Sequence, residues 1–187
     1  MVNNAPNLNL YPLYLTLNEC LYLSFMFLKK YNDTDFEILN NWVTDPDTLF
    51  LFSGSAWQYP LSFDQLKNFY LLNSLRRPYL AFSDDNIPIA FGEIITGDDH
   101  SPRLGRLLIG NTENRGKGLG KQFIQLLIEE SKKLFNPDLI YLFVLEDNFS
   151  AIRCYEKIGF IFDSEIRITE SYNGVQKSIL LMTLALK

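Results

Sequence analysis

The sequence predicts one mixed α/β domain with a central, mostly antiparallel sheet and about four helices on its faces. Its 187 residues, 47% apolar and 21% charged, suit one globular domain with a real core. Short β-type segments are joined by hairpin-type turns at Asp84–Asn86 and Tyr172–Gly174. Two short helix-type segments precede them, and a long amphipathic segment runs from about Gly116 to Phe135.

The N-terminal region, from Leu8 to Leu28, is rich in Leu, Tyr and Phe. Pro12 and Glu19 interrupt it and no Lys or Arg precedes it, so it fits neither a secretory signal nor a transmembrane helix. We therefore expect residues 1–20 to be an extension, either an extra strand or a packing arm, and residues 21–187 to form the single domain. A cytoplasmic protein without a membrane partner is expected.

The first half of the domain is expected to hold four strands and two helices. Thr34 with Glu37, and Ser62 with Gln65, have the spacing of capping boxes at the two helix starts. The expected elements are a strand at Leu21–Lys30, a helix at Asp35–Val43, a second helix from Ser62 to near Arg76, and strands at Tyr79–Ser83, Ile87–Thr96 and Leu104–Ile109.

The segment Leu49–Pro60, between the two helices, is expected to be irregular. It is rich in aromatic residues, and Trp42 lies close before it. Two interpretations are open: these aromatic side chains pack in the core, or some of them line a pocket for a substrate. The aromatic residues are Trp42, Phe52, Trp57 and Tyr59.

The second half alternates helices and strands and ends in a hairpin. The apolar run Leu139–Leu145 predicts a strand buried on both faces. Gly159 is placed to end the shorter helix. The expected elements are helices at Gly116–Phe135 and Ser150–Lys157 and strands at Leu139–Leu145, Phe160–Thr169 and Val175–Leu186.

Charge and reactive residues narrow the functional classes. The formal net charge of -5 disfavours a general nucleic-acid binder. The two cysteines, Cys20 and Cys154, have no metal-ligand spacing, and the one histidine, His100, lies in a turn with Asp98 and Asp99. A metal site or a Ser-His-Asp triad therefore has little support, and no metal is expected.

The stretch Leu107–Gln122 predicts an anion-binding loop. A short apolar strand leads through a polar turn into a glycine-rich helix start, where backbone N–H groups can approach a phosphate. Arg115, Lys117 and Lys121 add positive charge. A P-loop is excluded because Gln122 follows Gly120–Lys121, and the glycines lack dinucleotide-fold spacing.

Two motifs resemble those of the GNAT superfamily of N-acetyltransferases. Arg115, Gly118 and Gly120 match the fixed positions of its pyrophosphate loop, and Asn148 and Tyr155, seven residues apart, match its C-terminal motif. The segment from Phe27 to Tyr79 resembles the branch with ribosomal-protein alanine acetyltransferases. The resemblance implies a sheet that splays at the cofactor cleft.

The resemblance also implies acetyl-CoA as cosubstrate and a primary amine as acceptor, either a small molecule or a protein N-terminus, in a monomer or homodimer. Direct attack in a ternary complex is expected, since no Cys or Ser is placed as an acyl carrier. The alternative is a non-catalytic acyl-CoA-binding domain. The expected cofactor-binding residues are Leu107, Leu108, Ile109, Arg115, Gly116, Lys117, Gly118, Leu119, Gly120, Lys121, Asn148 and Tyr155.

Two residues are candidates for proton transfer. Tyr155 matches the family's general acid, and a phenol of pKa about 10 can protonate a thiolate of pKa about 8.5; its alternative role is packing on the sheet. Some relatives have a glutamate that acts as general base at the position where this chain has Phe143. Glu93 lies on an otherwise apolar strand, where a carboxylate is costly without a purpose, so Glu93 is the candidate general base here. Alternatively, Glu93 faces solvent or pairs with Arg106. Asn148 is expected to bind the pantetheine arm, cap its helix, or do both.

Overall fold

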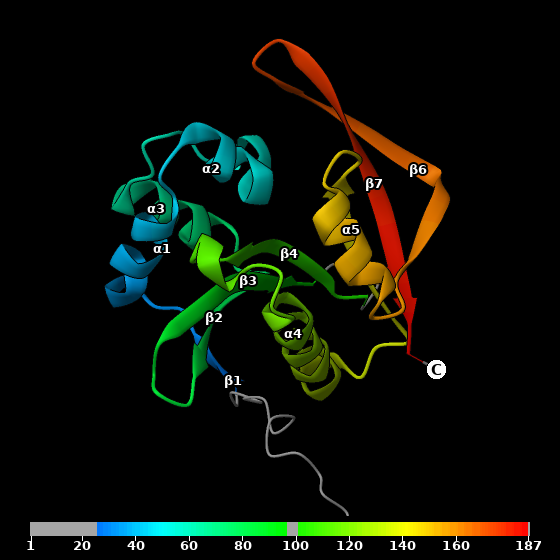
Figure 1. The fold of residues 1–187 in the computed structure, drawn as a ribbon, viewed down its shortest axis with the longest axis horizontal. Coiled ribbons are helices and arrows are strands. Elements are labelled where there is room, and N and C mark those ends of the chain that lie inside the picture. The colour runs from blue at the N-terminus through cyan, green and yellow to red at the C-terminus, as the bar shows by residue number, and fades with distance from the viewer. Residues whose placement is uncertain (1–25, 97–100, 187) are drawn as a thin grey trace, which may run out of the picture.

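The computed structural model describes residues 26–96 and 101–186 and shows a seven-stranded sheet in the order β1-β2-β3-β4-β5-β7-β6 (Figure 1). The strands are β1 (Met26–Lys30), β2 (Arg76–Ser83), β3 (Pro88–Ile95), β4 (Arg103–Ile109), β5 (Leu139–Leu145), β6 (Ile161–Tyr172) and β7 (Val175–Ala185). The α-helices are α1 (Phe36–Trp42), α2 (Pro46–Ser53), α3 (Phe63–Leu72), α4 (Leu119–Phe135) and α5 (Phe149–Glu156). The predicted N-terminal arm lies outside the described residues, as does the turn with His100.

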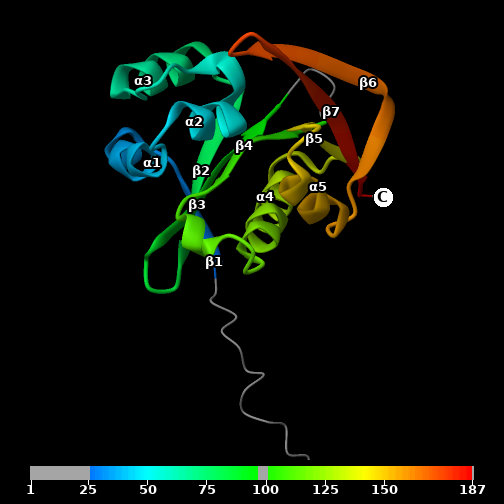
Figure 2. The same ribbon diagram turned by 45° about the horizontal axis from the view of Figure 1, so that its top comes forward.

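Helices cover both faces of the sheet, as a mixed α/β domain requires (Figure 2). On one face α4 and α5 pack on the strands, with Phe123, Leu127 and Tyr155 in one apolar core. On the other face α1, α2 and α3 enclose a second core that contains Leu39, Phe52 and other aromatic side chains. The predicted fold class is confirmed, with five α-helices in the described part of the chain where about four were expected.

The sheet is antiparallel except between β4 and β5, and that pair opens along its length. Parallel pairing is recorded at Arg103 with Tyr141 and at Leu104 with Leu142. The rest of β4, from Gly105 to Ile109, has no register partner on β5. The expected splay is therefore present, and it leaves backbone groups of β4 available at the centre of the sheet.

Helix α2 corrects the expectation that Leu49–Pro60 is irregular throughout. The Asp45 carboxylate caps it by accepting from the Thr48 N–H at 2.7 Å, and Pro46 occupies the first helical position. Both features are sequence signals of a helix start, but Asp45 and Pro46 also suit the end of the preceding helix, which the sequence predicts at Asp35–Val43. After Ser53 the chain forms only a short 3-10 turn, Gly54–Ala56.

Two helix boundaries also differ from the expectation. The capping box at the start of the first helical segment uses Asn32 and Asp35 rather than Thr34 and Glu37. Helix α3 begins after Ser62, as predicted, but it ends at Leu72 and not near Arg76. Arg76 is already the first residue of β2. For the predicted strand Leu21–Lys30, the described part, Met26–Lys30, is confirmed as β1, and residues 21–25 lie outside the described residues. The remaining elements agree with the prediction within a few residues, and β5 has the predicted bounds.

The β6–β7 hairpin is long, and its tip reaches α2 (Figures 1 and 2). There Tyr172 stacks on Phe50 with ring centres 3.9 Å apart and donates a hydrogen bond to Asp47 at 2.6 Å. Glu170 accepts a hydrogen bond from the Ser55 N–H at 2.8 Å. These contacts bring together elements that are more than a hundred residues apart in the chain. No helix of the described ranges is long and apolar enough to span a membrane.

Candidate active site

Strand β4 changes its pairing at the centre of the sheet. On β3, Phe91 pairs with Leu108 and Glu93 with Gly105, so β4 carries one extra residue over this interval. This bulge places Arg106 at φ +48°, a left-handed conformation that non-glycine residues rarely adopt. The bulge turns the Arg106 and Leu107 region away from regular pairing, next to the opening between β4 and β5.

The glycine-rich loop connects β4 to α4. Gly116 and Gly118 have φ values of +77° and +84°, which an L side chain adopts only with strain. Gly118 precedes the first residue of α4, so the unpaired N–H groups of the helix start lie in this loop. With Arg115 and Lys121, the loop has the donors and the charge that an anion needs.

A cavity of about 590 Å³ lies between this loop, the end of β4 and α5. It is lined by all the predicted cofactor-binding residues except Lys117, which is exposed, and Leu119, which packs against the core. A volume of this size suits a small-molecule site. The predicted residues that line it are Leu107, Leu108, Ile109, Arg115, Gly116, Gly118, Gly120, Lys121, Asn148 and Tyr155.

Asn148 starts α5 at the edge of this cavity. Its Oδ1 accepts hydrogen bonds from the Ala151 N–H at 3.3 Å and from the Ser150 hydroxyl at 3.1 Å, so the predicted capping role is confirmed. Because the cap uses the oxygen, the side-chain amide still has its N–H donors to offer. Capping and ligand binding are thus compatible for this residue.

Tyr155 lies on α5 and is 7% exposed. Burial raises its pKa, and the neighbouring Cys154 adds to the rise. The phenol is therefore protonated at neutral pH and is a donor rather than a base. Its ring contacts Phe160 in the core, yet Tyr155 also lines the cofactor-side cavity and a second cavity beside it. Tyr155 therefore both packs in the core and lines the two cavities.

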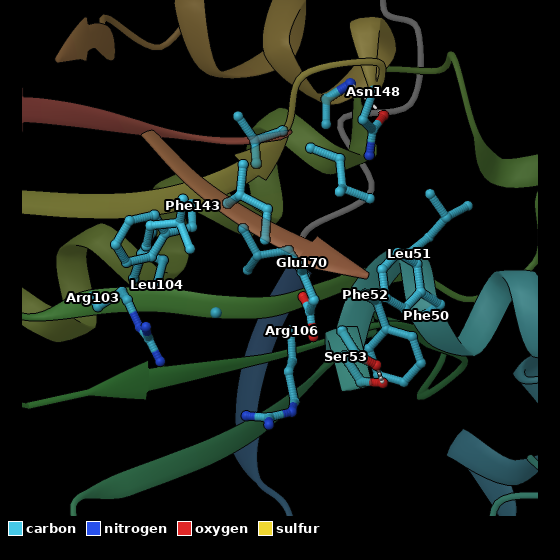
Figure 3. Close-up of a pocket in the computed structure, with 18 of the residues that line it drawn as sticks. Phe50, Leu51, Phe52, Ser53, Arg103, Leu104, Arg106, Phe143, Asn148 and Glu170 are labelled. Atoms are coloured by element: carbon cyan, nitrogen blue, oxygen red, sulfur yellow. Dashed lines mark hydrogen bonds between the residues drawn. The ribbon is translucent and has the colours of Figure 1, made fainter. Parts of the chain in front are cut away.

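The second cavity, of about 320 Å³, is lined by α2 on one side and by β4 and β5 on the other (Figure 3). We call it the acceptor cavity and the larger one the cofactor cavity. Leu107, Asn148 and Tyr155 line both, so the two cavities meet beside the bulge and Tyr155. Phe52 also lines both, which confirms that an aromatic residue of the segment after Trp42 faces a pocket, while Trp57 packs in the core.

Glu93 is fully buried and makes three side-chain contacts. Its Oε2 accepts from Arg106 at 2.8 Å and from Arg76 at 2.9 Å, and its Oε1 accepts from the Tyr70 hydroxyl at 2.5 Å. The pairing of Glu93 with Arg106, one of the two alternatives for this residue, is confirmed. Glu93 does not line either described cavity, although both of its arginine partners line the acceptor cavity.

Several lining residues were not identified from the sequence. Thr48 and Leu51 belong to α2, and Arg103 and Glu170 face the acceptor cavity from β4 and from the hairpin. The Asp45-Pro46 signal points to α2, but nothing in the local sequence brings position 170 next to α2. Cys154 also lines the cofactor cavity, and burial raises its pKa, which disfavours the nucleophilic thiolate.

A glycine-rich anion loop, a splayed β4–β5 pair and two adjoining cavities define a site for two substrates that meet beside a buried tyrosine. Residues 21–160 match the model of the Acetyltransferase (GNAT) family, well over half of the chain. The chain therefore belongs to the GNAT acetyltransferase family, as its two motifs suggested.

The curated relatives are polyamine acetyltransferases that match over a short region. The spermine/spermidine N(1)-acetyltransferase of Bacillus subtilis (strain 168) is 42% identical over 60 residues, which cover 32% of this chain and 37% of the relative. A probable spermine N(1)-acetyltransferase of Bacillus subtilis subsp. natto matches with the same values. The matched region spans well under half the length of these relatives.

Solved structures of the same kind are similar over most of the chain. Spermidine N-acetyltransferase from Vibrio cholerae in complex with CoA and spermine has a TM-score of 0.72 at 21% identity, covering 86% of this chain and 95% of that chain. A dodecameric structure of the Vibrio cholerae enzyme in an intermediate state has a TM-score of 0.67 at 22% identity, covering 86% and 93%. At these identities the likeness shows a shared fold.

Proposed function

We propose that this protein is an acetyl-CoA-dependent N-acetyltransferase that moves the acetyl group to a primary amine by direct attack in a ternary complex. The observation that supports this most is the meeting of the two cavities at Leu107, Asn148 and Tyr155. A thioester bound in the cofactor cavity and an amine bound in the acceptor cavity would come together there. A domain that only binds or senses acyl-CoA has no need of the second cavity.

The cofactor cavity would hold acetyl-CoA through its anion loop. Gly116, Gly118 and Gly120 would offer backbone N–H groups to the pyrophosphate, and Arg115 and Lys121 would neutralise its charge. The Asn148 amide would donate to the pantetheine arm, and a backbone N–H of the unpaired part of β4 would stabilise the developing negative charge on the thioester oxygen.

Tyr155 is proposed as the general acid. When the amine attacks the thioester carbon, the C–S bond breaks and the thiolate leaves with the bonding electron pair. The buried, protonated phenol of Tyr155 would give its proton to that sulfur. Cys154, although it lines the same cavity, is a poor acyl carrier because burial disfavours its thiolate. This supports direct attack over an acyl-enzyme.

The contacts of Glu93 support a structural role more than that of a general base. Its two oxygens already accept three hydrogen bonds, two from guanidiniums and one from the Tyr70 hydroxyl. An amine in the acceptor cavity has no direct access to a side chain that is fully buried. We propose that Glu93 holds Arg76 and Arg106 in place at the cavity wall.

The proposal is tested by measuring release of free CoA thiol from acetyl-CoA across classes of amines. Polyamines belong in the panel because spermine and spermidine stand in the names of the relatives. We expect thiol release that depends on one class of primary amine, with the N-acetylated amine formed in equal amount. Saturable CoA binding with no acetyl transfer to any amine would instead favour a binding domain.

A further inference from the structure

The charged residues of the acceptor cavity are mostly basic. Among the described residues that line it, the charged ones are Arg76, Arg103 and Arg106 on the strands and Glu170 on the hairpin. In Figure 3, Arg103 and Arg106 both extend from β4, with Phe143 beside Arg103. This is an unexpected lining for a site that accepts a polyamine, because a polycation would be repelled by the guanidiniums.

The carboxylates near this cavity are already engaged. Glu93 gives one oxygen to both Arg76 and Arg106, so a single negative charge serves two positive ones. Glu170 accepts hydrogen bonds from the Ser55 backbone N–H and hydroxyl, which hold it against the turn after α2. Three guanidiniums therefore face two carboxylates, and the described wall keeps an excess of positive charge.

Arg103 is the arginine of this cavity whose guanidinium is available to bind a carboxylate of a ligand. It is half-buried and lies over the Phe143 ring, 5.5 Å from its centre, and it forms no ion pair with any carboxylate in the described ranges. Its pKa is lowered by burial first and then by the nearby Arg76, while Arg106 adds a smaller contribution. An anion beside Arg103 would relieve this repulsion.

We propose that the acceptor is a small amine that also carries a carboxylate, and that Arg103 selects it by binding that carboxylate. The inference rests on the proposed acetyltransferase function and names its substrate class. The planar guanidinium fork matches a carboxylate in a two-point contact, and the ring of Phe143 holds the fork in a fixed plane. The amine end of the acceptor then extends toward Tyr155, which also lines this cavity.

The cavity itself limits the size of this acceptor. Its volume of about 320 Å³ lies at the small end of ligand sites, and the β6–β7 hairpin closes it through Glu170 and Ile168. Aromatic side chains from α2, Phe50 and Phe52, supply apolar wall on the other side. A free amino acid or an ω-amino acid fits a cavity that has an apolar wall, a guanidinium at one end and the proposed site of acetyl transfer at the other.

The test compares acceptors that differ in the presence of a carboxylate. Leucine is paired with leucinamide, and γ-aminobutyrate with putrescine, at equal acetyl-CoA. We expect kcat/KM to favour the carboxylate member of at least one pair by roughly 10- to 100-fold, the factor of a charge-assisted contact. A carboxylate preference in neither pair, or no turnover of any amino carboxylate, would overturn the proposal.

Variants of Arg103 assign the effect to this residue. Arg103→Gln should raise KM for the preferred amino carboxylate at least about 10-fold and so reduce its advantage over the partner that lacks the carboxylate, and Arg103→Lys should restore part of the loss. Arg167→Gln is the matched control, since Arg167 is exposed, pairs with Glu146 and lies outside both cavities. An equal KM rise in Arg167→Gln, or none in Arg103→Gln, would contradict the assignment.

This test separates the two proposals. If leucinamide or putrescine is acetylated as well as its carboxylate partner, the acetyltransferase function holds and the substrate class is wrong. If CoA binds but neither the two pairs nor any amine of the wider panel is acetylated, both proposals fail.

Discussion

Glu93 on β3 and Arg106 on β4 are joined by a 2.8 Å ion pair across the bulge where β4 leaves regular pairing. The arginine is held in a left-handed conformation, and its guanidinium lies against the rings of Phe69 and Trp57, 4.3 and 4.7 Å from their centres. Its side chain is 8% exposed. The ion pair therefore fixes the backbone of β4 where the two cavities meet.

Removing the charge of Glu93 should destabilise the fold. Glu93→Gln leaves two guanidiniums in the interior without their counter-charge, and we expect urea unfolding to show a loss of about 3 kcal/mol or more. Glu129→Gln, which loses an exposed pair with Lys132, should cost less than about 1 kcal/mol. A Glu93→Gln protein of unchanged stability that lacks activity would instead identify Glu93 as the general base.

Replacing Tyr155 by Phe should separate binding from chemistry. The variant keeps the ring that packs against Phe160 and removes only the hydroxyl. We expect kcat to fall about 100-fold or more, with the Kd for CoA within about threefold of the parent. Stopped-flow thiol release and CoA titration measure the two quantities. An unchanged kcat would remove Tyr155 from the role of acid.

Two glycines of the anion loop should respond differently to alanine. Gly118→Ala places a side chain at φ +84° and should cost about 1–2 kcal/mol of unfolding free energy. At Gly120 an added Cβ meets Cys154 and Ile109 only at ordinary contact distance, so stability should change by less than about 1 kcal/mol.

Both alanine variants should nevertheless bind CoA at least about 10-fold more weakly, because the methyl group hinders approach of the phosphate to the backbone. Thermal unfolding of the free protein and CoA titration give the two readouts. Tight CoA binding by Gly120→Ala would place the pyrophosphate elsewhere.

The pH profile should report the acceptor amine and not Tyr155. Burial raises the pKa of Tyr155, so its proton stays bound at and above the usual value of about 10. Because only the neutral amine attacks, kcat/KM should rise with pH towards the pKa of the acceptor, about 10.4 for an alkyl amine. We expect kcat to show no loss between about pH 7 and 9.5; a fall in that range that Tyr155→Phe abolishes would contradict the assignment.

The same shift has a consequence for stability. The folded state binds the phenol proton more tightly than the unfolded state does, so this contribution to stability is fully present below about pH 10 and is lost as the pH rises further. Tyr155→Phe should therefore weaken the alkaline destabilisation, as measured by urea unfolding at about pH 9 and pH 11.

Short sequence motifs predicted the parts of this site whose residues lie close together in the chain. Gly118, Asn148 and Tyr155 owe their positions to short motifs within a single strand-loop-helix or turn-helix unit, and the structure places all three in one cavity. The acceptor cavity depends on contacts that no local pattern encodes. Arg103 and Glu170 lie far apart in sequence, and their meeting follows from the length of the β6–β7 hairpin and from its contacts with α2.

Helix α2 shows a different reason for a missed element. Asp45 and Pro46 carry the signal for its start, but the same residues also suit the end of α1. The consecutive apolar residues of α2 show no alternation of polar and apolar positions with the helical period, so the sequence pattern did not indicate a helix. For Glu93, the sequence correctly suggested Arg106 as partner. It did not indicate that Arg76 and Tyr70 complete the set, because the Arg76 contact depends on the register of β2 with β3 and the Tyr70 contact on how α3 packs over the sheet.

A single-turnover experiment tests the central claim most directly. The protein, in excess over acetyl-CoA labelled in the acetyl group, is mixed with the acceptor and quenched at intervals for mass spectrometry of protein and acceptor. The account predicts that the label passes from acetyl-CoA to the amine nitrogen at the rate of thiol release, with no labelled protein at any time. Label on the protein before it reaches the amine, with Cys154 as the first residue to examine, or no label on any amine, would contradict direct transfer in a ternary complex.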